Sequence, residues 1–172
     1  IGKELFAELG YEEIGMDHFA LKTDSLYKAT INKTLHRNFM GYTSNKTQLM
    51  IGLGMSAISD SWYGFAQNVK TVKEYQQIVN TGEIPVFRGH ILSEEDSVIR
   101  KHILNIMCHF STSWDEKSTE IKNIEVHLEL LKDLEKDGIV TIKNKSLTVP
   151  EKARPFVRNI CMAFDKKLID KK

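Results

Sequence analysis

The amino-acid sequence predicts an α/β segment followed by a mainly helical segment, and three observations favour this fold class. Helical and strand-like apolar patterns alternate over residues 1–61. This alternation is typical of α/β units with parallel strands, although two such units are too few to close a barrel. From Ser93 onward helical patterns dominate. One short β-hairpin is expected where residues 139–149 alternate around Asn144 and Lys145.

The N-terminal elements are predicted from apolar spacing and turn residues. A helical stripe that ends at Gly10 predicts the first helix. A strand is expected over residues 11–20, with Asp17 and His18 toward its C-terminal end. The capping residues that follow it predict a helix running to about Leu35.

Residues 49–58 are almost wholly apolar but carry Gly52 and Gly54. An apolar run of this length is typical of a strand that is buried on both faces. Glycine destabilises a strand unless another backbone or a ligand approaches closely. The run therefore predicts either a core strand under tight helix packing, or a buried strand whose C-terminal end opens onto a bound molecule.

The remaining elements are predicted from helical stripes and polar breaks. They are a helix over residues 69–80, an extended segment over 84–92, a helix from Ser93, a polar break at 111–115, a helical region over 117–137 interrupted near Asn123, and a last helix whose apolar stripe runs to Leu168. The order of helices and hairpin after residue 93 is like that of a winged helix. Acidic and basic residues are nearly balanced there, which argues against DNA binding because phosphate contact needs a basic face.

Composition excludes several further classes. The formal net charge is +1, so no strong attraction to nucleic acid or to an anionic membrane is expected. Neither a signal peptide pattern nor an apolar run of transmembrane length is present in the sequence. Cys108 and Cys161 lack metal-site spacing and fit free core thiols in a reducing compartment, which favours a cytoplasmic protein. The start at Ile1, without an initiator Met, suggests a piece of a longer protein.

Two stretches carry a family resemblance: residues 14–21, IGMDHFAL, and residues 36–59, HRNFMGYTSNKTQLMIGLGMSAIS. They resemble the oxygen-independent coproporphyrinogen III oxidases, which are radical S-adenosylmethionine enzymes of haem biosynthesis. The sequence RNICM from Arg158, with the Phe-Asp pair at 164–165, is similar to the C-terminal signature of that family. The resemblance is collinear and extends into the last predicted helix.

The resemblance implies that the chain is the C-terminal portion of such an enzyme. Residues 1–61 would be the last units of an incomplete (β/α) TIM-like barrel, residues 62–92 a connecting segment, and residues 93–172 a helical, winged-helix-like domain. The family holds a [4Fe–4S] cluster in a Cys-x3-Cys-x2-Cys loop, and this sequence contains no such loop. The chain alone is therefore expected to be inactive. It is also expected to self-associate through barrel strands that lack their neighbours.

The reaction implied by the resemblance is oxidative decarboxylation of two propionates of coproporphyrinogen III to vinyl groups, which gives protoporphyrinogen IX. The family uses a 5′-deoxyadenosyl radical formed from S-adenosylmethionine, of which two molecules are expected in the full-length protein. The electron acceptor is not implied. No nucleic acid or membrane partner is expected. Two alternatives remain: a haem-binding or haem-cleaving relative, or a winged-helix interaction module.

Three residues are expected to contact cofactor by this resemblance. Ile58 corresponds to a family position that contacts a bound S-adenosylmethionine, and the small neighbour Ala57 would let backbone groups reach it. Met40 stands where the family usually has Gln near the second cofactor or the substrate. Methionine fills space but donates no amide hydrogen bond. The alternative for Ile58 is plain core packing.

Four residues are expected to contact the substrate, whose four propionates need cationic or hydrogen-bonding partners. Arg37 and His36 lie in the family signature, and arginine suits bidentate carboxylate binding. Asp17 and His18 could orient each other by a hydrogen bond and contact substrate or cofactor. The alternatives are a structural ion pair or loop anchor for Arg37 and a loop-fixing bond for Asp17 and His18. Tyr42 is interpreted as a packing residue.

Overall fold

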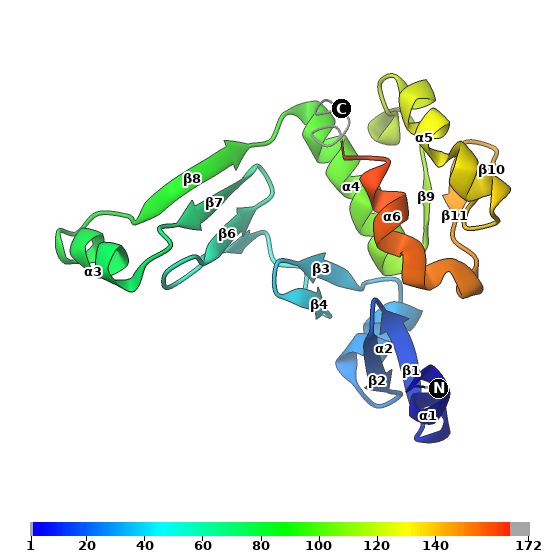
Figure 1. Cartoon of the computed structure of the whole chain (residues 1–172), viewed down its shortest axis with the longest axis horizontal. Coiled ribbons are helices and arrows are strands. Elements are labelled where there is room, and N and C mark those ends of the chain that lie inside the picture. The colour runs from blue at the N-terminus through cyan, green and yellow to red at the C-terminus, as the bar shows by residue number, and fades with distance from the viewer. Residues whose placement is uncertain (1, 166–172) are drawn as a thin grey trace. The chain divides into compact units, whose positions relative to one another are not determined.

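A computed structural model of the chain describes residues 2–165 and divides the protein into two compact units (Figure 1). Unit 1 comprises Ile1–Lys46 and Val98–Lys172, and unit 2 comprises Thr47–Ser97. The predicted stripe residue Leu168 lies outside the described residues. Every helix within residues 2–165 falls short of the length and apolarity that a bilayer crossing requires.

Unit 1 begins with helix α1 (Gly2–Glu8) and a β-hairpin of β1 (Tyr11–Gly15) and β2 (His18–Leu21). The prediction of one strand over residues 11–20 is wrong, because the chain reverses at Met16 and Asp17. Both residues have positive φ, 36° and 62°, as a tight two-residue hairpin turn requires. An apolar–polar alternation has the same period on both sides of such a turn, so it does not show where the chain reverses.

A second helix and a second hairpin follow. Helix α2 (Ser25–Ile31) begins at Asp24, whose carboxylate accepts a hydrogen bond from the backbone of Leu26 at 2.7 Å. It ends before the predicted Leu35, because the chain turns at Lys33 with φ 56° and the next two backbone N–H groups both donate to the carbonyl of Ala29. Strands β3 (His36–Asn38) and β4 (Gly41–Thr43) then pair antiparallel.

The second part of unit 1 is mainly helical, as predicted. Its elements, in order, are α4 (Glu94–His109, whose first turn lies in unit 2), β9 (Ser111–Ser113), the 3₁₀ helix η1 (Lys117–Thr119), α5 (Ile124–Lys136), β10 (Thr141–Lys143), β11 (Ser146–Thr148), the 3₁₀ helix η2 (Glu151–Phe156) and α6 (Val157–Met162). The break at Asn123 and the hairpin turn at Asn144 and Lys145 are confirmed, since all three residues have positive φ. The predicted polar break at 111–115 is instead a third strand, which pairs with β11.

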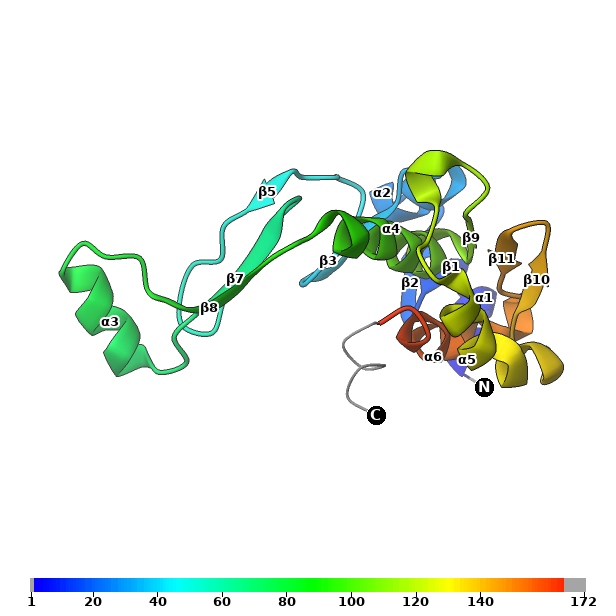
Figure 2. The same cartoon turned by 90° about the horizontal axis from the view of Figure 1, so that it is seen from above.

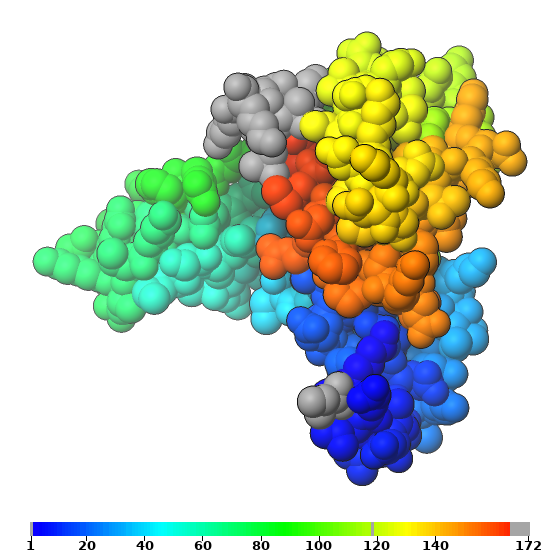
Figure 3. All heavy atoms as spheres, turned by 45° about the vertical axis from the view of Figure 1, so that its right-hand side comes forward, coloured from blue at the N-terminus to red at the C-terminus, as the bar shows by residue number. Residues whose placement is uncertain are grey.

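The core of unit 1 is centred on Phe164, which is fully buried. His102 from α4 and His127 from α5 both stack on its ring, with centroids 6.2 and 5.5 Å away. The backbone carbonyl of Ala163 accepts a hydrogen bond from His127 Nδ1 at 2.8 Å, which ties α5 to the end of α6. Figure 3 shows the yellow atoms of α5 directly against the orange atoms of η2 and α6.

Unit 2 is a four-stranded antiparallel sheet with one helix. Its elements are β5 (Leu49–Met50), β6 (Ile58–Ser61), β7 (Gly64–Asn68), α3 (Val72–Asn80) and β8 (Val86–Ile91), and the strand order is β5-β6-β7-β8. Figures 1 and 2 show β7 and β8 running side by side. Every strand pairing among the described residues is antiparallel, so the predicted parallel α/β pairing is not found there.

The prediction of a single buried strand over residues 49–58 is also wrong. Pairing stops after Met50, and the chain forms a loop through Gly54 (φ 98°) and Ser56 (φ 59°) before β6 begins. The buried amide of Asn68 donates from Nδ2 to two carbonyl oxygens of this loop, those of Gly52 at 3.0 Å and Gly54 at 2.9 Å. Gly54 therefore permits a loop conformation here, whereas the uninterrupted run of apolar residues had predicted a continuous strand.

Unit 2 has very little apolar interior of its own. Val69 and Pro85 are its only buried apolar residues. Large hydrophobic side chains lie exposed on its strands, loops and helix instead: Leu49, Ile51, Leu53, Met55, Tyr63, Val72, Val79, Ile84, Val86, Phe87 and Ile91. Exposed apolar surface on this scale is typical of a region that contacts another part of a protein.

Candidate functional site

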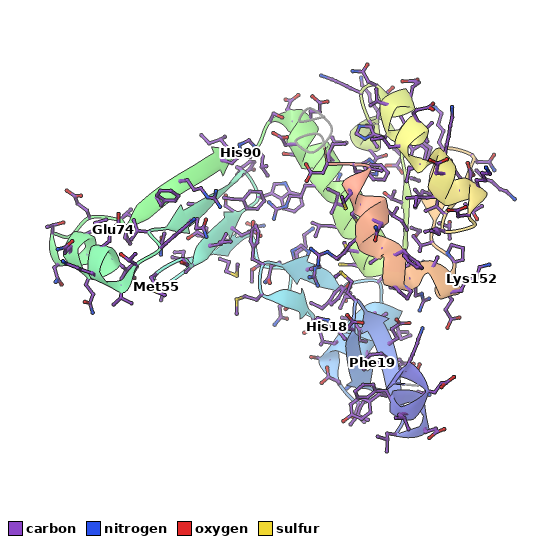
Figure 4. All side chains as sticks on the ribbon, viewed as in Figure 1. His18, Phe19, Met55, Glu74, His90 and Lys152 are labelled. Atoms are coloured by element: carbon purple, nitrogen blue, oxygen red, sulfur yellow. The ribbon has the colours of Figure 1, made fainter. Side chains whose placement is uncertain are left out.

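Two of the predicted substrate-binding residues meet at Tyr42, a residue that the sequence had indicated only as packing. Tyr42 lies on β4 and is buried. The Arg37 guanidinium, from the paired position on β3, stacks over the ring with its Cζ 4.7 Å from the ring centroid. The imidazole of His18 meets the same ring edge-on, with centroids 5.1 Å apart (Figure 4 labels His18). The β1–β2 and β3–β4 hairpins thus bring a cation and an imidazole to one aromatic ring.

Tyr42 is held by the long helix of unit 1. Its hydroxyl donates a hydrogen bond to the backbone carbonyl of Met107 on α4 at 2.9 Å. Burial raises the pKa of Tyr42 to about 12, although the nearby charge of Arg37 acts in the opposite direction. The hydroxyl therefore remains a protonated donor across the physiological pH range.

Arg37 has one guanidinium nitrogen without a hydrogen-bond partner among residues 2–165. Its side chain is half-buried, and the fully shielded Nη1 has no hydrogen-bond partner among the described residues. Burial raises the pKa of both neighbouring thiols, Cys108 and Cys161, to about 12, so these neighbours are neutral. A guanidinium that is stacked on an aromatic ring and faces neutral groups is suited to accept an anion.

His18 is oriented by the backbone. Its Nδ1 lies 2.8 Å from the carbonyl oxygen of Met16, so Nδ1 carries the donated proton and Nε2 of the neutral ring is an acceptor. The neighbouring Asp17 is exposed at the hairpin turn. The orienting bond that the sequence hypothesis gave to Asp17 is thus made by Met16.

His36 and Met40 occupy different environments from Arg37. His36 is buried on β3, and the alternation of side chains along a strand places it on the opposite face of the hairpin from Arg37. Met40 is 86% exposed at the hairpin turn, where its backbone N–H donates to Asn38 Oδ1 at 2.8 Å. The Met40 side chain is therefore open to contact, whereas that of His36 is enclosed by protein.

Ala57 and Ile58, the other predicted cofactor-binding residues, belong to unit 2. Both are half-buried, and Ile58 begins β6 opposite Gln67. The loop folds back on this strand so tightly that a Cβ atom on Gly52 would lie 2.8 Å from the carbonyl carbon of Ile58. The structure thus brings Ala57 and Ile58 together with the glycine loop, which also carries the exposed Met55 labelled in Figure 4.

Metal binding is not supported by the described residues. Among residues 2–165, no three or more His, Cys, Asp or Glu side chains gather in a way that could hold a metal ion. Cys108 and Cys161 are buried free thiols, which confirms their interpretation as core residues. Their raised pKa disfavours the thiolate that a metal or a cluster requires.

Sequence reasoning missed three residues that shape these sites. Tyr42 was interpreted only as a packing residue, and neither Gly15 nor Asn68 was singled out. A Cβ atom on Gly15 would lie 2.6 Å from the Tyr42 hydroxyl oxygen. The sequence around Asn68 does not indicate that its side-chain amide binds the loop at Gly52 and Gly54, more than ten residues earlier in the chain.

The sequence and the fold both have clear counterparts in known proteins. No protein-family model matches the chain. A solved structure from Escherichia coli, described as a radical SAM enzyme, matches with a TM-score of 0.88 and 37% identity. The match covers 97% of this chain and 40% of that one. The fold of this chain is therefore similar to that of the matching part of a radical SAM enzyme.

The names of the similar proteins specify one kind of radical SAM enzyme. The Escherichia coli structure is that of a coproporphyrinogen III oxidase. The oxygen-independent coproporphyrinogen III oxidase of Pseudomonas aeruginosa is 38% identical over 170 residues, which is 96% of this chain and 37% of that protein. The Escherichia coli enzyme of the same name is 39% identical over 161 residues, or 91% of this chain and 35% of that protein. The resemblance to oxygen-independent coproporphyrinogen III oxidases is confirmed, and the chain spans about a third of the length of these relatives.

Proposed function

We propose that the chain is the C-terminal part of an oxygen-independent coproporphyrinogen III oxidase. The full-length enzyme would convert two propionates of coproporphyrinogen III to vinyl groups in haem biosynthesis, giving protoporphyrinogen IX. The observation that carries this proposal is 38% identity to a named oxidase over 96% of the chain, whose run from His36 to Tyr42 also resembles the family signature. That run forms the hairpin on which Arg37 stacks against Tyr42.

The architecture proposed for the whole enzyme follows the three-part division of the sequence. Residues 1–61 would end the incomplete barrel, residues 62–92 would connect, and residues 93–172 would form the helical domain. The order helix, strand, helix, two-stranded hairpin, with the early strand β9 pairing on β11, supports a winged-helix-like description of that domain.

The chemistry of the described residues supports a role in S-adenosylmethionine binding but not in iron–sulfur cluster binding. Their thiols do not fit an iron–sulfur cluster, so the cluster would be held by a part of the enzyme that this chain lacks. The half-buried Ala57 and Ile58 and the exposed Met40 fit apolar contact with S-adenosylmethionine, two molecules of which are proposed for the full-length protein. S-adenosylmethionine would supply the radical that removes a hydrogen atom from the propionate; these residues would exclude water and limit what that radical meets.

Substrate recognition is proposed for Arg37 and His18. Arg37 is half-buried and offers planar N–H donors, and a propionate carboxylate supplies the matching acceptors. His18 lies on the same aromatic ring and can add a second polar contact. Asp17 and His36 are also proposed to contact the substrate; Asp17 is exposed at the turn, whereas His36 is enclosed by protein.

Steady-state kinetics of the full-length enzyme test this proposal. Arg37→Ala should raise the KM for coproporphyrinogen III by about tenfold or more, because a hydrogen bond to a charged group contributes roughly 1.5–3 kcal/mol. Arg88→Ala is the matched control, since Arg88 is exposed in unit 2 and donates from Nε to Gln67 Oε1 at 2.9 Å. Unchanged KM in the Arg37 variant would contradict the substrate contact. Absence of any coproporphyrinogen turnover by the wild-type enzyme would contradict the proposed activity itself.

The chain alone is expected to lack activity. After reconstitution with iron and sulfide under anaerobic conditions, the 172-residue chain should not cleave S-adenosylmethionine. Cleavage at a rate comparable to that of the full-length enzyme would show that the cluster ligands lie within this chain.

A further inference from the structure

Three segments that are distant in the sequence meet at the Tyr42 ring. The β1–β2 hairpin contributes His18, β3 contributes Arg37, and α4 contributes the carbonyl of Met107. The hydroxyl bond to Met107 joins residues that are 65 positions apart. Tyr42 is thus fixed by one part of unit 1 and supports two side chains from another.

The hydroxyl bond has a specific reason to form. Met107 belongs to the last turn of α4, where backbone carbonyls lack an intrahelical donor. The Tyr42 hydroxyl supplies that donor at 2.9 Å. On the other side, Gly15 leaves the space that the ring end occupies, since a Cβ there would lie 2.6 Å from Oη and 3.0 Å from Cζ. The position of the ring is therefore set from both sides by backbone.

The stacked guanidinium benefits from this fixed ring. An arginine side chain has several rotamers in solvent and loses that freedom when it binds a carboxylate. A ring 4.7 Å from Cζ holds the guanidinium plane in one orientation before an anion arrives. The same ring limits the tilt of the His18 imidazole, whose other side is tied to Met16.

We infer that Tyr42 is a positioning residue that preorganises Arg37 to bind a carboxylate of the substrate and holds the His18 imidazole beside it. The inference rests on the proposed function, which supplies the propionate. It assigns Tyr42 no contact with the reacting atoms: its hydroxyl is committed to Met107, and its ring acts through the two side chains stacked on it. Loss of the ring and loss of the hydroxyl should consequently have different effects.

Binding measurements on the full-length protein separate these effects. The probe is coproporphyrinogen III, kept anaerobic, and its tetramethyl ester is the matched ligand without carboxylates. Tyr42→Phe keeps the ring, so it should lower the unfolding temperature but change the Kd of the acid by less than twofold. Tyr42→Leu removes the ring, so it should raise the Kd of the acid about tenfold and leave that of the ester unchanged.

A double-mutant cycle shows whether Tyr42 acts through Arg37. In an Arg37→Ala background, Tyr42→Leu should add less than twofold to the Kd of the acid, because the side chain that it positions is gone. A full tenfold effect of Tyr42→Leu in that background would overturn the inference, as would equal losses for acid and ester. If Arg37→Ala itself leaves the Kd of the acid unchanged, the proposed carboxylate contact fails. If Arg37→Ala weakens binding and Tyr42→Leu does not, only the positioning role fails.

Arg37→Lys keeps the inference testable should Tyr42→Leu fail to fold. Lysine retains the charge but has no planar group to stack on the ring. It should therefore raise the Kd of the acid at least fivefold without affecting the ester. Binding of the acid as tight as in the wild-type protein would mean that charge alone suffices and that the ring positions nothing.

Discussion

Replacing Gly15 by alanine tests the close approach on which the Tyr42 site is built. The new Cβ would lie 2.6 Å from the Tyr42 hydroxyl oxygen, 3.0 Å from Cζ of that ring and 3.4 Å from Cζ of Phe110. The φ of Gly15 is +153°, which adds backbone strain of about 1–3 kcal/mol. Overpacking a filled site costs a further 1–3 kcal/mol, roughly. The two contributions together predict a loss of about 2–6 kcal/mol in the free energy of unfolding.

Urea and thermal unfolding of the 172-residue chain, followed by circular dichroism, measure this loss. Gly10→Ala is the matched control. Gly10 also has positive φ, at +81°, but a Cβ there meets no atom within 4 Å. The control should lose only the strain contribution, about 1–2 kcal/mol. The difference between the two variants then isolates the steric contribution of Tyr42, and each kcal/mol shifts the unfolding temperature by roughly 2–4 °C.

Equal losses in the two glycine variants would refute the reasoning, since the contact with Tyr42 would then contribute nothing. Pairing Gly15→Ala with Tyr42→Leu gives a second reading. If the clash is with the ring, removing the ring should recover most of the steric part of the loss and leave the strain part. A double variant that is less stable than either single variant would contradict the proposed geometry.

Three further predictions concern other parts of the chain. Burial lowers the pKa of His102, so the unfolded state binds more protons than the folded state below the ordinary pKa of about 6.5. The free energy of unfolding should therefore fall as the pH drops from 7 to 5. His102→Gln should make this pH dependence weaker in unfolding titrations, and an unchanged pH dependence would assign it to other groups. Asn68→Ala should speed hydrogen exchange of the glycine-loop amides by about tenfold or more, since two loop carbonyls lose their donor at about 1–3 kcal/mol; Asn80→Ala, on exposed helix α3, should leave that exchange unchanged. The isolated chain should self-associate in sedimentation experiments through the exposed apolar residues of unit 2, and Ile91→Lys on the edge strand β8 should weaken this association; a monomeric wild-type chain at high concentration would rule it out.

Local signals in the sequence were sufficient for several elements. Ser93 and the acidic residues after it predicted the start of α4. The Ser93 hydroxyl oxygen accepts a hydrogen bond from the backbone N–H of Asp96, and the Asp96 carboxylate accepts hydrogen bonds from the backbone N–H and the hydroxyl of Ser93. Asn144 and Lys145 predicted the last hairpin because few residues adopt positive φ readily. These elements depend on contacts between residues close in the sequence, which a single sequence contains.

Long-range features were not accessible in the same way. Residues 49–58 are apolar because unit 2 exposes apolar surface, and the sequence does not distinguish exposed from buried leucine. The pairing of β9 with β11 joins Thr112 to Leu147, and nothing local to either residue indicates the partner. Parallel pairing was expected from the alternation of helix and strand, but hairpin turns hidden inside an alternating pattern produce the same alternation with antiparallel strands.

Only part of the site was predicted, because its long-range contacts are not visible in the sequence. Arg37 and His18 were recognised as candidates from the family signatures in which they lie. Their meeting point was not, because Tyr42 binds Met107 across 65 residues and Gly15 matters only through the space that it leaves empty. A residue whose role is to lack a side chain gives no positive signal in one sequence.

The interruption of unit 1 by residues 47–97 has a consequence for how the chain folds. Unit 1 is completed only after Val98 has been synthesised, because α5, α6 and all but the first turn of α4 follow the inserted unit. Closing contacts over such separations slows folding, since the entropy of loop closure is lost before the contacts form. Changes in the length of the segment 47–97 should therefore alter the folding rate of unit 1 more than the packing of its core. The two hairpins that carry His18 and Arg37 are synthesised before α4 and remain without it until the second part of unit 1 follows.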